Sequence, residues 1–181
     1  QNSVDTPFHF LVIKCLNYDH TSKYQLPVKP SPNLPDMHSV YWYPSTCFFE
    51  GTNLSEGRGT DKPFEIFGAP SLPKNMYAFT PVSKEGAANP KYVNQVCYGW
   101  NVSDSISPAT DKKLNLKYLI EAYKLFPNKD SFFIKPKTNN ATAYFFNKLA
   151  GNAALMQQLI DGKTEEEIRA SWQPVLTKFK Q

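Results

Sequence analysis

Residues 43–70 read YPSTCFFEGTNLSEGRGTDKPFEIFGAP and contain four of the eight glycines of the chain. Glu50, Asn53, Glu56 and Arg58 lie next to these glycines or between them. Glycine is used where the backbone must adopt a positive φ angle or approach another group closely. A loop that adds two carboxylates, a guanidinium and an amide to such points could bind a polar ligand. A tight structural loop with its charges in water has the same composition, so the residues alone leave both interpretations open.

The polar residues of this stretch suggest sugar recognition. Glycosidases commonly place two carboxylates beside a sugar, and Arg58 offers a planar fork that suits a carboxylate or a phosphate. The two glutamates could also bind sugar hydroxyls or pair with Arg58. For Thr52 and Thr60, bonding inside the loop is favoured over ligand binding. The candidate substrate-binding residues are Glu50, Asn53, Glu56, Arg58 and Thr60.

Aromatic and histidine side chains supply weaker candidates. An aromatic ring can stack on a sugar face, although each ring taken singly is more often part of a core. The cluster at residues 41–43 is the strongest of these because it precedes the glycine-rich loop. For His20 and His38, surface or structural roles are favoured over acid–base chemistry. The aromatic candidates are Tyr18, Tyr41, Trp42, Tyr43 and Trp100.

Composition narrows the class of protein. A chain of 181 residues with 41% hydrophobic and 14% aromatic residues suits one folded domain rather than a disordered segment. The net charge of +4 comes from scattered lysines and arginines, which argues against nucleic-acid binding. No apolar run approaches the length of a membrane span. The chain begins at Gln1 without a start Met or a signal peptide, so we expect a fragment of a longer protein.

The three cysteines, Cys15, Cys47 and Cys97, are widely spaced and form no CxxC motif. Their spacing with the three histidines is not that of a metal site, so we expect no metal and no cofactor. Buried thiols are favoured, and one disulfide is possible but cannot be assigned.

The pattern of the chain predicts an α+β fold, with helices packed on a mixed sheet and concentrated in the C-terminal half. Four prolines between residues 27 and 35 exclude a helix there and predict a tight turn at 30–33. Strands are predicted at 8–16, 47–49, 64–67, 75–82, 92–102 and 132–134. Helices are predicted at 37–43, 116–126, 141–150 and 153–161, with caps at Asp36, Asn115, Asn140 and Asn152. A last helix follows a Thr164–Glu167 capping box and is expected to kink at Pro174.

Several motifs, taken in chain order, resemble the DUF1343 family, which is associated with the NamZ exo-β-N-acetylmuramidases. The resemblance covers nearly the whole chain, and EGTNLSEGRGT is its most specific part. The motifs are PSPN (30–33), YPSTCFFEGTNLSEGRGT (43–60), PFE (63–65), GAP (68–70), FTP (79–81), CYG (97–99) and GKTEEEIRASW (162–172).

The resemblance implies a glycoside hydrolase that releases N-acetylmuramic acid from the non-reducing end of peptidoglycan fragments. It implies a Rossmann-like N-terminal domain, a smaller C-terminal domain and an active site between or near them. Only the C-terminal part matches residues 1–181, so the principal catalytic glutamate is expected in the other domain and no residue here is assigned a catalytic role. The chain also stops short of the Arg- and Tyr-containing end of the family. Tyr18-Asp19-His20 stands where the family often has Trp and basic residues, so no substrate contact is expected there.

The resulting prediction is the substrate-cleft domain of a bacterial, extracytoplasmic peptidoglycan hydrolase. Its partners would be a peptidoglycan-derived sugar and its own N-terminal domain. The 181-residue chain alone is expected to be inactive. The alternative is a non-catalytic carbohydrate-binding or protein-interaction module.

Overall fold

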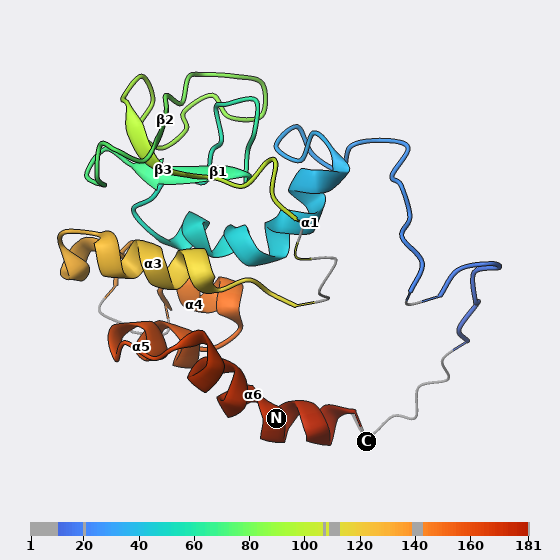
Figure 1. The fold of residues 1–181 in the computed structure, drawn as a ribbon. Coiled ribbons are helices and arrows are strands. Elements are labelled where there is room, and N and C mark those ends of the chain that lie inside the picture. The colour runs from blue at the N-terminus through green and yellow to red at the C-terminus, as the bar shows by residue number, and fades with distance from the viewer. Residues whose placement is uncertain (1–10, 20, 107, 109–112, 139–142, 181) are drawn as a thin grey trace.

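A computed structural model describes residues 11–19, 21–106, 108, 113–138 and 143–180. A small sheet lies on one side of helix α1 and the 3₁₀ helix η1, and the C-terminal helices lie on the other side (Figure 1). The α+β class and the concentration of helices in the C-terminal half are confirmed. The helices are α1 (Met37–Thr46), α3 (Lys117–Leu125), α4 (Phe145–Ala150), α5 (Ala154–Ile160) and α6 (Glu165–Phe179), with 3₁₀ helices η1 (Cys47–Gly51) and η2 (Lys129–Ser131).

The sheet contains β1 (Ile66–Ala69), β2 (Tyr77–Phe79) and β3 (Cys97–Asn101), in the order β1-β3-β2. Both pairings are antiparallel, so the described sheet is antiparallel and not mixed as predicted. Gly68 lies opposite Gly99 in the register. A Cβ atom on Gly99 would lie 1.9 Å from the carbonyl oxygen of Phe67, which explains why glycine stands at this pair.

The core is an aromatic cluster between the sheet and the helices. Phe67 of β1 stacks on Phe49 of η1, with ring centroids 4.6 Å apart, and on Trp100 of β3 at 5.7 Å. Phe133 contacts Phe146 of α4 at 4.9 Å. Stacked and edge-to-face rings bury large apolar areas and restrict each other's orientation. Phe67 of the sheet, Phe49 of η1 and Phe146 of α4 therefore belong to one core cluster.

Helix α1 and helix η1 carry the chain into the glycine-rich loop. Asp36 caps α1 as predicted, accepting the amide of Ser39 at 2.8 Å in a capping box. The predicted stop at Pro44 is wrong, because the helix continues to Thr46. Proline removes one amide donor, but its restricted φ angle suits the helix. The predicted strand at 47–49 is also wrong: an apolar run this short does not reveal its period, and here it is the 3₁₀ helix η1.

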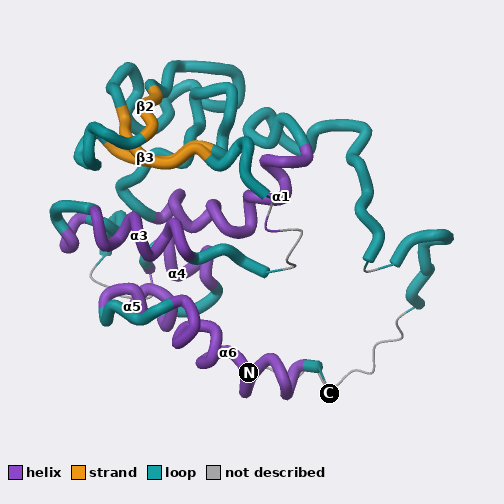
Figure 2. Tube along the Cα trace, in the orientation of Figure 1, coloured by secondary structure: helices purple, strands orange, loops and turns teal. Residues whose placement is uncertain are grey.

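The predicted strands differ from the structure at their ends. Residues 11–16 of the predicted strand 8–16 form no strand, and Leu11 and Leu16 are 89% and 92% exposed. This segment leaves the body of the molecule without packing against it, and residues 8–10 lie outside the described residues (Figure 2). Strand β1 starts two residues later than predicted, after Phe64 at φ 64°. Tyr92 and Asn94 also have positive φ angles, so β3 begins only at Cys97.

The remaining short segments follow the prediction in part. Strand β2 lies inside the predicted range 75–82. Phe133, predicted in a strand at 132–134, forms a single β-bridge with Thr52. The turn predicted at 30–33 lies one residue later, at 31–34, where the Leu34 amide donates to the Ser31 carbonyl at 3.0 Å.

Helices α3 and α5 begin one residue later than predicted, after Leu116 and Ala153, so the predicted caps Asn115 and Asn152 lie one residue before the observed ones. Helix α4 begins only at Phe145 rather than at residue 141. Asn115 accepts the amide of Lys117 at 3.1 Å, and Asn152 accepts that of Ala154 at 2.9 Å. The capping box between Thr164 and Glu167 is confirmed. Helix α6 continues through Pro174, and the predicted cap Asn140 lies outside the described residues.

A histidine–carboxylate pair ties α1 to the start of β1. His38 Nδ1 lies 2.6 Å from a carboxylate oxygen of Glu65, and His38 Nε2 lies 3.0 Å from the carbonyl of Ser105. The Glu65 side chain is only 4% exposed. Burial raises the pKa of Glu65 above its ordinary value, against the opposing effect of His38. His38 therefore has a structural role, as the sequence favours.

The contact between η1 and α4 gives a first prediction. A Cβ atom on Gly51 would lie 2.6 Å from the backbone of Phe146. Because well-packed interiors do not admit an added methyl group, Gly51→Ala should lower the free energy of unfolding by about 1–3 kcal/mol. Urea denaturation measures this change. The exposed Ser83→Ala is the control, and an equal effect of both substitutions would contradict the close contact.

The buried carboxylate gives a second prediction. A carboxyl whose pKa is raised in the folded state binds a proton on folding, so its contribution to stability is lost as the pH rises through that pKa. Glu65→Gln removes this titration. The free energy of unfolding of the variant should therefore rise relative to wild type as the pH increases from about 4.5 upward. Denaturation across this range measures the difference, with the exposed Glu166→Gln as control; equal pH dependence in wild type and Glu65→Gln would disprove it.

Candidate functional site

The glycine-rich loop, residues 50–60, is fastened by its backbone to the sheet. Ser55 and Gly68 exchange two hydrogen bonds of 2.7 and 3.0 Å. Gly57 and Gly59 both have a φ angle of 80°, a conformation that side chains disfavour. The carbonyl of Gly59 accepts the amide of Val82 at 2.9 Å. The loop is therefore a defined part of the fold and can hold its side chains in fixed positions.

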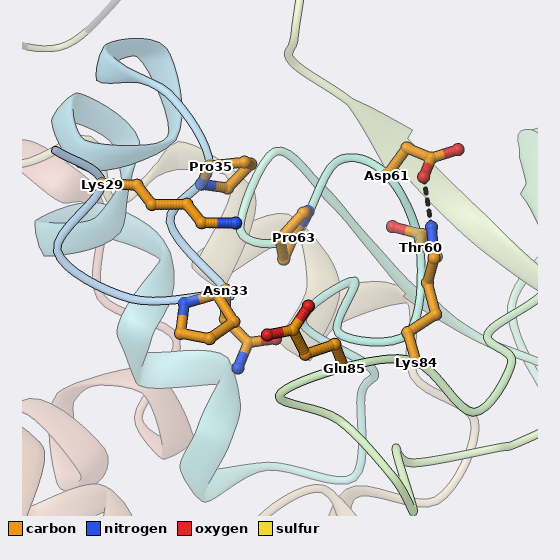
Figure 3. A pocket seen from close by; sticks show the side chains of 10 residues that line it. Lys29, Asn33, Pro35, Thr60, Asp61, Pro63, Lys84 and Glu85 are labelled. Atoms are coloured by element: carbon orange, nitrogen blue, oxygen red, sulfur yellow. Dashed lines mark hydrogen bonds and ion pairs between the residues drawn. The ribbon is translucent and has the colours of Figure 1, made fainter.

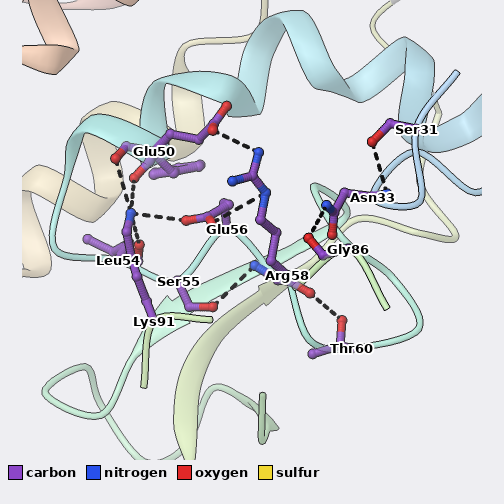
Figure 4. A network of polar contacts seen from close by, with 12 residues as sticks. Ser31, Asn33, Glu50, Leu54, Ser55, Glu56, Arg58, Thr60, Gly86 and Lys91 are labelled. Atoms are coloured by element: carbon purple, nitrogen blue, oxygen red, sulfur yellow. Dashed lines mark hydrogen bonds and ion pairs between the residues drawn. The ribbon is translucent and has the colours of Figure 1, made fainter. Parts of the chain in front are cut away.

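Three of the five predicted binding residues come together on this loop (Figure 4). Arg58 Nη2 donates to Glu50 Oε2 at 2.9 Å, and Arg58 Nε lies 3.8 Å from Glu56 Oε1. The Arg58 side chain is 35% exposed, whereas those of Glu50 and Glu56 are 13% and 5% exposed. The guanidinium also lies over the ring of Phe64, 5.3 Å from its centroid. The two carboxylates are thus inside and the guanidinium reaches the surface.

Sequence reasoning missed the fourth member of this cluster, Lys91. Its Nζ lies 3.0 Å from Glu56 Oε2 and within hydrogen-bond distance of four backbone carbonyls of residues 49–54. No local motif marks Lys91, because it approaches the loop from a distant turn that follows Pro90. The cluster therefore contains two carboxylates and two cations.

Burial is the main cause of the shifted pKa values of Glu50 and Lys91 in this cluster. Burial raises the pKa of Glu50, against the opposing charge of Arg58, and the charge of Glu56 raises it further. Burial also lowers the pKa of Lys91, and the carboxylate of Glu56 opposes that effect. Each buried charge is thus offset by a neighbour of opposite sign, as buried ion pairs require.

The other two predicted binding residues form bonds within the protein. Asn53 Nδ2 donates to the carbonyl of Ser131 at 2.6 Å. Thr60 Oγ1 donates to the carbonyl of Gly57 at 2.6 Å, and Thr52 Oγ1 donates to that of Phe49 at 2.9 Å. Bonding of both threonines inside the loop, which the sequence favours, is confirmed. Asn53 connects the loop to the segment around η2.

Some of the aromatic candidates lie in the core, and one lies beside the charged cluster. Trp42 is buried in the core at 1% exposure, and Trp100 packs against the same core. Tyr43 is half-buried and lies edge-on to Phe64, with centroids 4.8 Å apart. Burial and then the charge of Glu50 raise the pKa of Tyr43, which places this ring beside the charged cluster. Tyr18 is exposed on the N-terminal segment, and His20 lies outside the described residues.

A separate cavity of about 180 Å³ lies beside the end of the loop. The residues that line it include Thr60, Asp61, Pro63, Lys84 and Glu85 (Figure 3). Lys84 pairs with Asp61, and this interaction lowers the pKa of the exposed Asp61 carboxyl. Of the five predicted binding residues, Thr60 lines this cavity.

The described part of the chain also bears on metal binding, cysteine pairing and membrane spanning. It contains no group of three or more His, Cys, Asp or Glu side chains that could hold a metal ion. The cysteines are free thiols, and the predicted burial holds only for Cys97: Cys15 is exposed and Cys47 is partly exposed. Burial raises the pKa of Cys97 to about 12. None of the described helices has both the length and the apolar character needed to cross a membrane.

Comparison with known proteins gives concordant matches. A family model described as "Exo-beta-N-acetylmuramidase NamZ, C-terminal" matches residues 41–181. The chain is 31% identical over 188 residues to the peptidoglycan beta-N-acetylmuramidase NamZ of Bacillus subtilis (strain 168), covering 91% of this chain and 40% of that protein. Its structure resembles the crystal structure of a DUF1343 family protein from Bacteroides fragilis NCTC 9343, with a TM-score of 0.82 and 42% identity, over 94% of this chain and 46% of that one.

The chain therefore spans less than half the length of these two relatives. The family resemblance predicted from EGTNLSEGRGT and the accompanying motifs is confirmed. Because the family model covers most of its residues, this chain belongs to the NamZ C-terminal domain family.

Proposed function

We propose that this chain forms one side of the substrate cleft of an exo-β-N-acetylmuramidase. The substrate would be a peptidoglycan fragment with N-acetylmuramic acid at its non-reducing end. The other side of the cleft would belong to a Rossmann-like domain that carries the principal catalytic glutamate. A bacterial, extracytoplasmic setting follows from that substrate.

The partly exposed guanidinium of Arg58 is the observation that carries this proposal. Glu50 fixes one nitrogen, Nη2, from the inside, and the ring of Phe64 supports the guanidinium. Within the described part of the chain, no hydrogen bond is assigned to Nη1. Arginine donates through five N–H groups, so Arg58 keeps donors for a ligand. N-acetylmuramic acid carries a lactyl carboxylate, which suits a charge-assisted pair with these donors.

Glu50 and Glu56 are better placed to position Arg58 than to cleave a glycosidic bond. Both are largely buried and both face a cation within 4 Å. A general acid or nucleophile must reach the glycosidic oxygen or the anomeric carbon. We therefore assign substrate recognition to the cluster and leave bond cleavage to the Rossmann-like domain.

The role of Arg58 can be tested by Arg58→Lys in a protein that joins this chain to the Rossmann-like domain. Lysine keeps the charge but loses the planar fork, so kcat/KM for muramyl substrates should fall about tenfold. Glucosaminyl analogues lack the lactyl carboxylate and should be affected much less. Lys74→Arg, at an exposed position, serves as the control. Equal losses on both substrate classes would exclude carboxylate recognition by Arg58.

If this chain recognises the sugar and the Rossmann-like domain cleaves the bond, the 181-residue chain alone should hydrolyse no muramyl glycoside. A chromogenic muramide measures this directly. Adding the Rossmann-like domain of a NamZ relative should produce turnover, while the chain alone should bind the sugar weakly. Robust turnover by the chain alone would contradict the proposal. Tight unaided binding of peptidoglycan fragments, with no gain of activity on mixing, would instead support a non-catalytic binding module.

A further inference from the structure

The ammonium group of Lys91 lies among more oxygen atoms than it can bond individually. An ammonium has three N–H donors, and five oxygens lie within 3.2 Å of it. They come from the loop that holds Glu50, Glu56 and Arg58 (Figure 4). The five oxygens are the carbonyls of Phe49, Glu50, Thr52 and Leu54, at 2.9, 3.2, 2.9 and 3.0 Å, and Oε2 of Glu56, at 3.0 Å.

Lys91 also completes the hydrogen bonding of the loop carbonyls. A buried carbonyl needs a donor, so each one from residue 49 to residue 54 can be accounted for. The carbonyl of Gly51 accepts the amide of Ile134 at 3.0 Å, and that of Asn53 accepts the hydroxyl of Tyr92 at 2.7 Å. The other four face Lys91 Nζ; of these, the carbonyl of Phe49 also accepts the amide and the hydroxyl of Thr52. Four backbone carbonyls therefore converge on one ammonium group.

Convergent backbone carbonyls are also the means by which proteins replace the hydration shell of a potassium ion. The distances around Nζ exceed the roughly 2.3–2.6 Å of calcium sites, so the space suits a large monovalent cation. We infer that residues 49–56 form a monovalent-cation site that Lys91 fills permanently, and that Lys91 thereby acts as the positioning residue of the charged cluster. Its importance for sugar recognition rests on the proposed function, whereas the cation site does not.

Electrostatics supports a structural need for this charge. Burial disfavours an ammonium, and it lowers the pKa of Lys91. The Glu56 side chain is 5% exposed, and its Oε2 is the atom that faces Nζ. Without a cation, the buried carboxylate and four carbonyl dipoles would repel each other, and the loop would have to open to water. Opening would displace Glu50, and with it Arg58.

Lys91→Ala tests the inference because it removes the ammonium and leaves room for a free cation. In tetramethylammonium chloride, which is too large for the cage, the Tm of the variant should fall by about 10 °C. Potassium or ammonium chloride at the same ionic strength should restore at least half of this loss, with saturation. The Tm of wild type should not depend on the choice of cation.

Lys91→Met is the matched control, because its apolar side chain occupies the cage and should abolish the cation response. If Lys91→Ala is unfolded in tetramethylammonium chloride, refolding on addition of potassium chloride, followed by circular dichroism, is the equivalent readout. Equal Tm values in all salts, or failure to refold in potassium, would overturn the inference. Rescue by n-butylammonium but not by potassium would also overturn it, because the site would then require N–H donors rather than a cation.

Discussion

The contact of the Lys91 ammonium with its surrounding oxygens is the interaction on which the glycine-rich loop depends. It joins the turn after Pro90 to backbone carbonyls of residues 49–54 and to the carboxylate of Glu56. A charge in this position stabilises only when its partners surround it closely, since the loss of water is expensive. The loop geometry and the presence of Lys91 are therefore mutually dependent.

From this cation the charges alternate outward to the surface. Lys91 pairs with Glu56, and Arg58 lies between Glu56 and Glu50. The alternation keeps the buried cluster close to neutral and leaves the guanidinium of Arg58 as its exposed end. A ligand carboxylate would continue the same pattern, which is why recognition suits this arrangement better than proton transfer. The ring of Phe64 lies against this exposed end, and Tyr43 packs edge-on against Phe64.

The aromatic core sets the position of this loop relative to the helices. Phe49 stacks on Phe67, so the 3₁₀ helix that ends at Gly51 is pressed against the sheet. Helix α4 approaches Gly51 so closely that a methyl group has no room. The loop is thus held by apolar packing on one side and by an ammonium on the other. Substitutions in the apolar packing or at Lys91 should therefore displace the charged cluster by moving the backbone of residues 49–54.

Local signals in the sequence determined the α+β class, the caps at Asp36 and Thr164, the turn at Ser31 and the family signature, because these depend on neighbours within a few residues. Tertiary structure decided the 3₁₀ form of residues 47–51, the antiparallel sheet and the late start of β3. These choices depend on which face each aromatic side chain buries, and a short apolar run does not encode that. The pairing of Glu50 with Arg58 could be anticipated within the loop, but Lys91 could not. A cation that approaches from a distant turn has no sequence period or spacing, and only the folded chain brings it to the carbonyls that it binds.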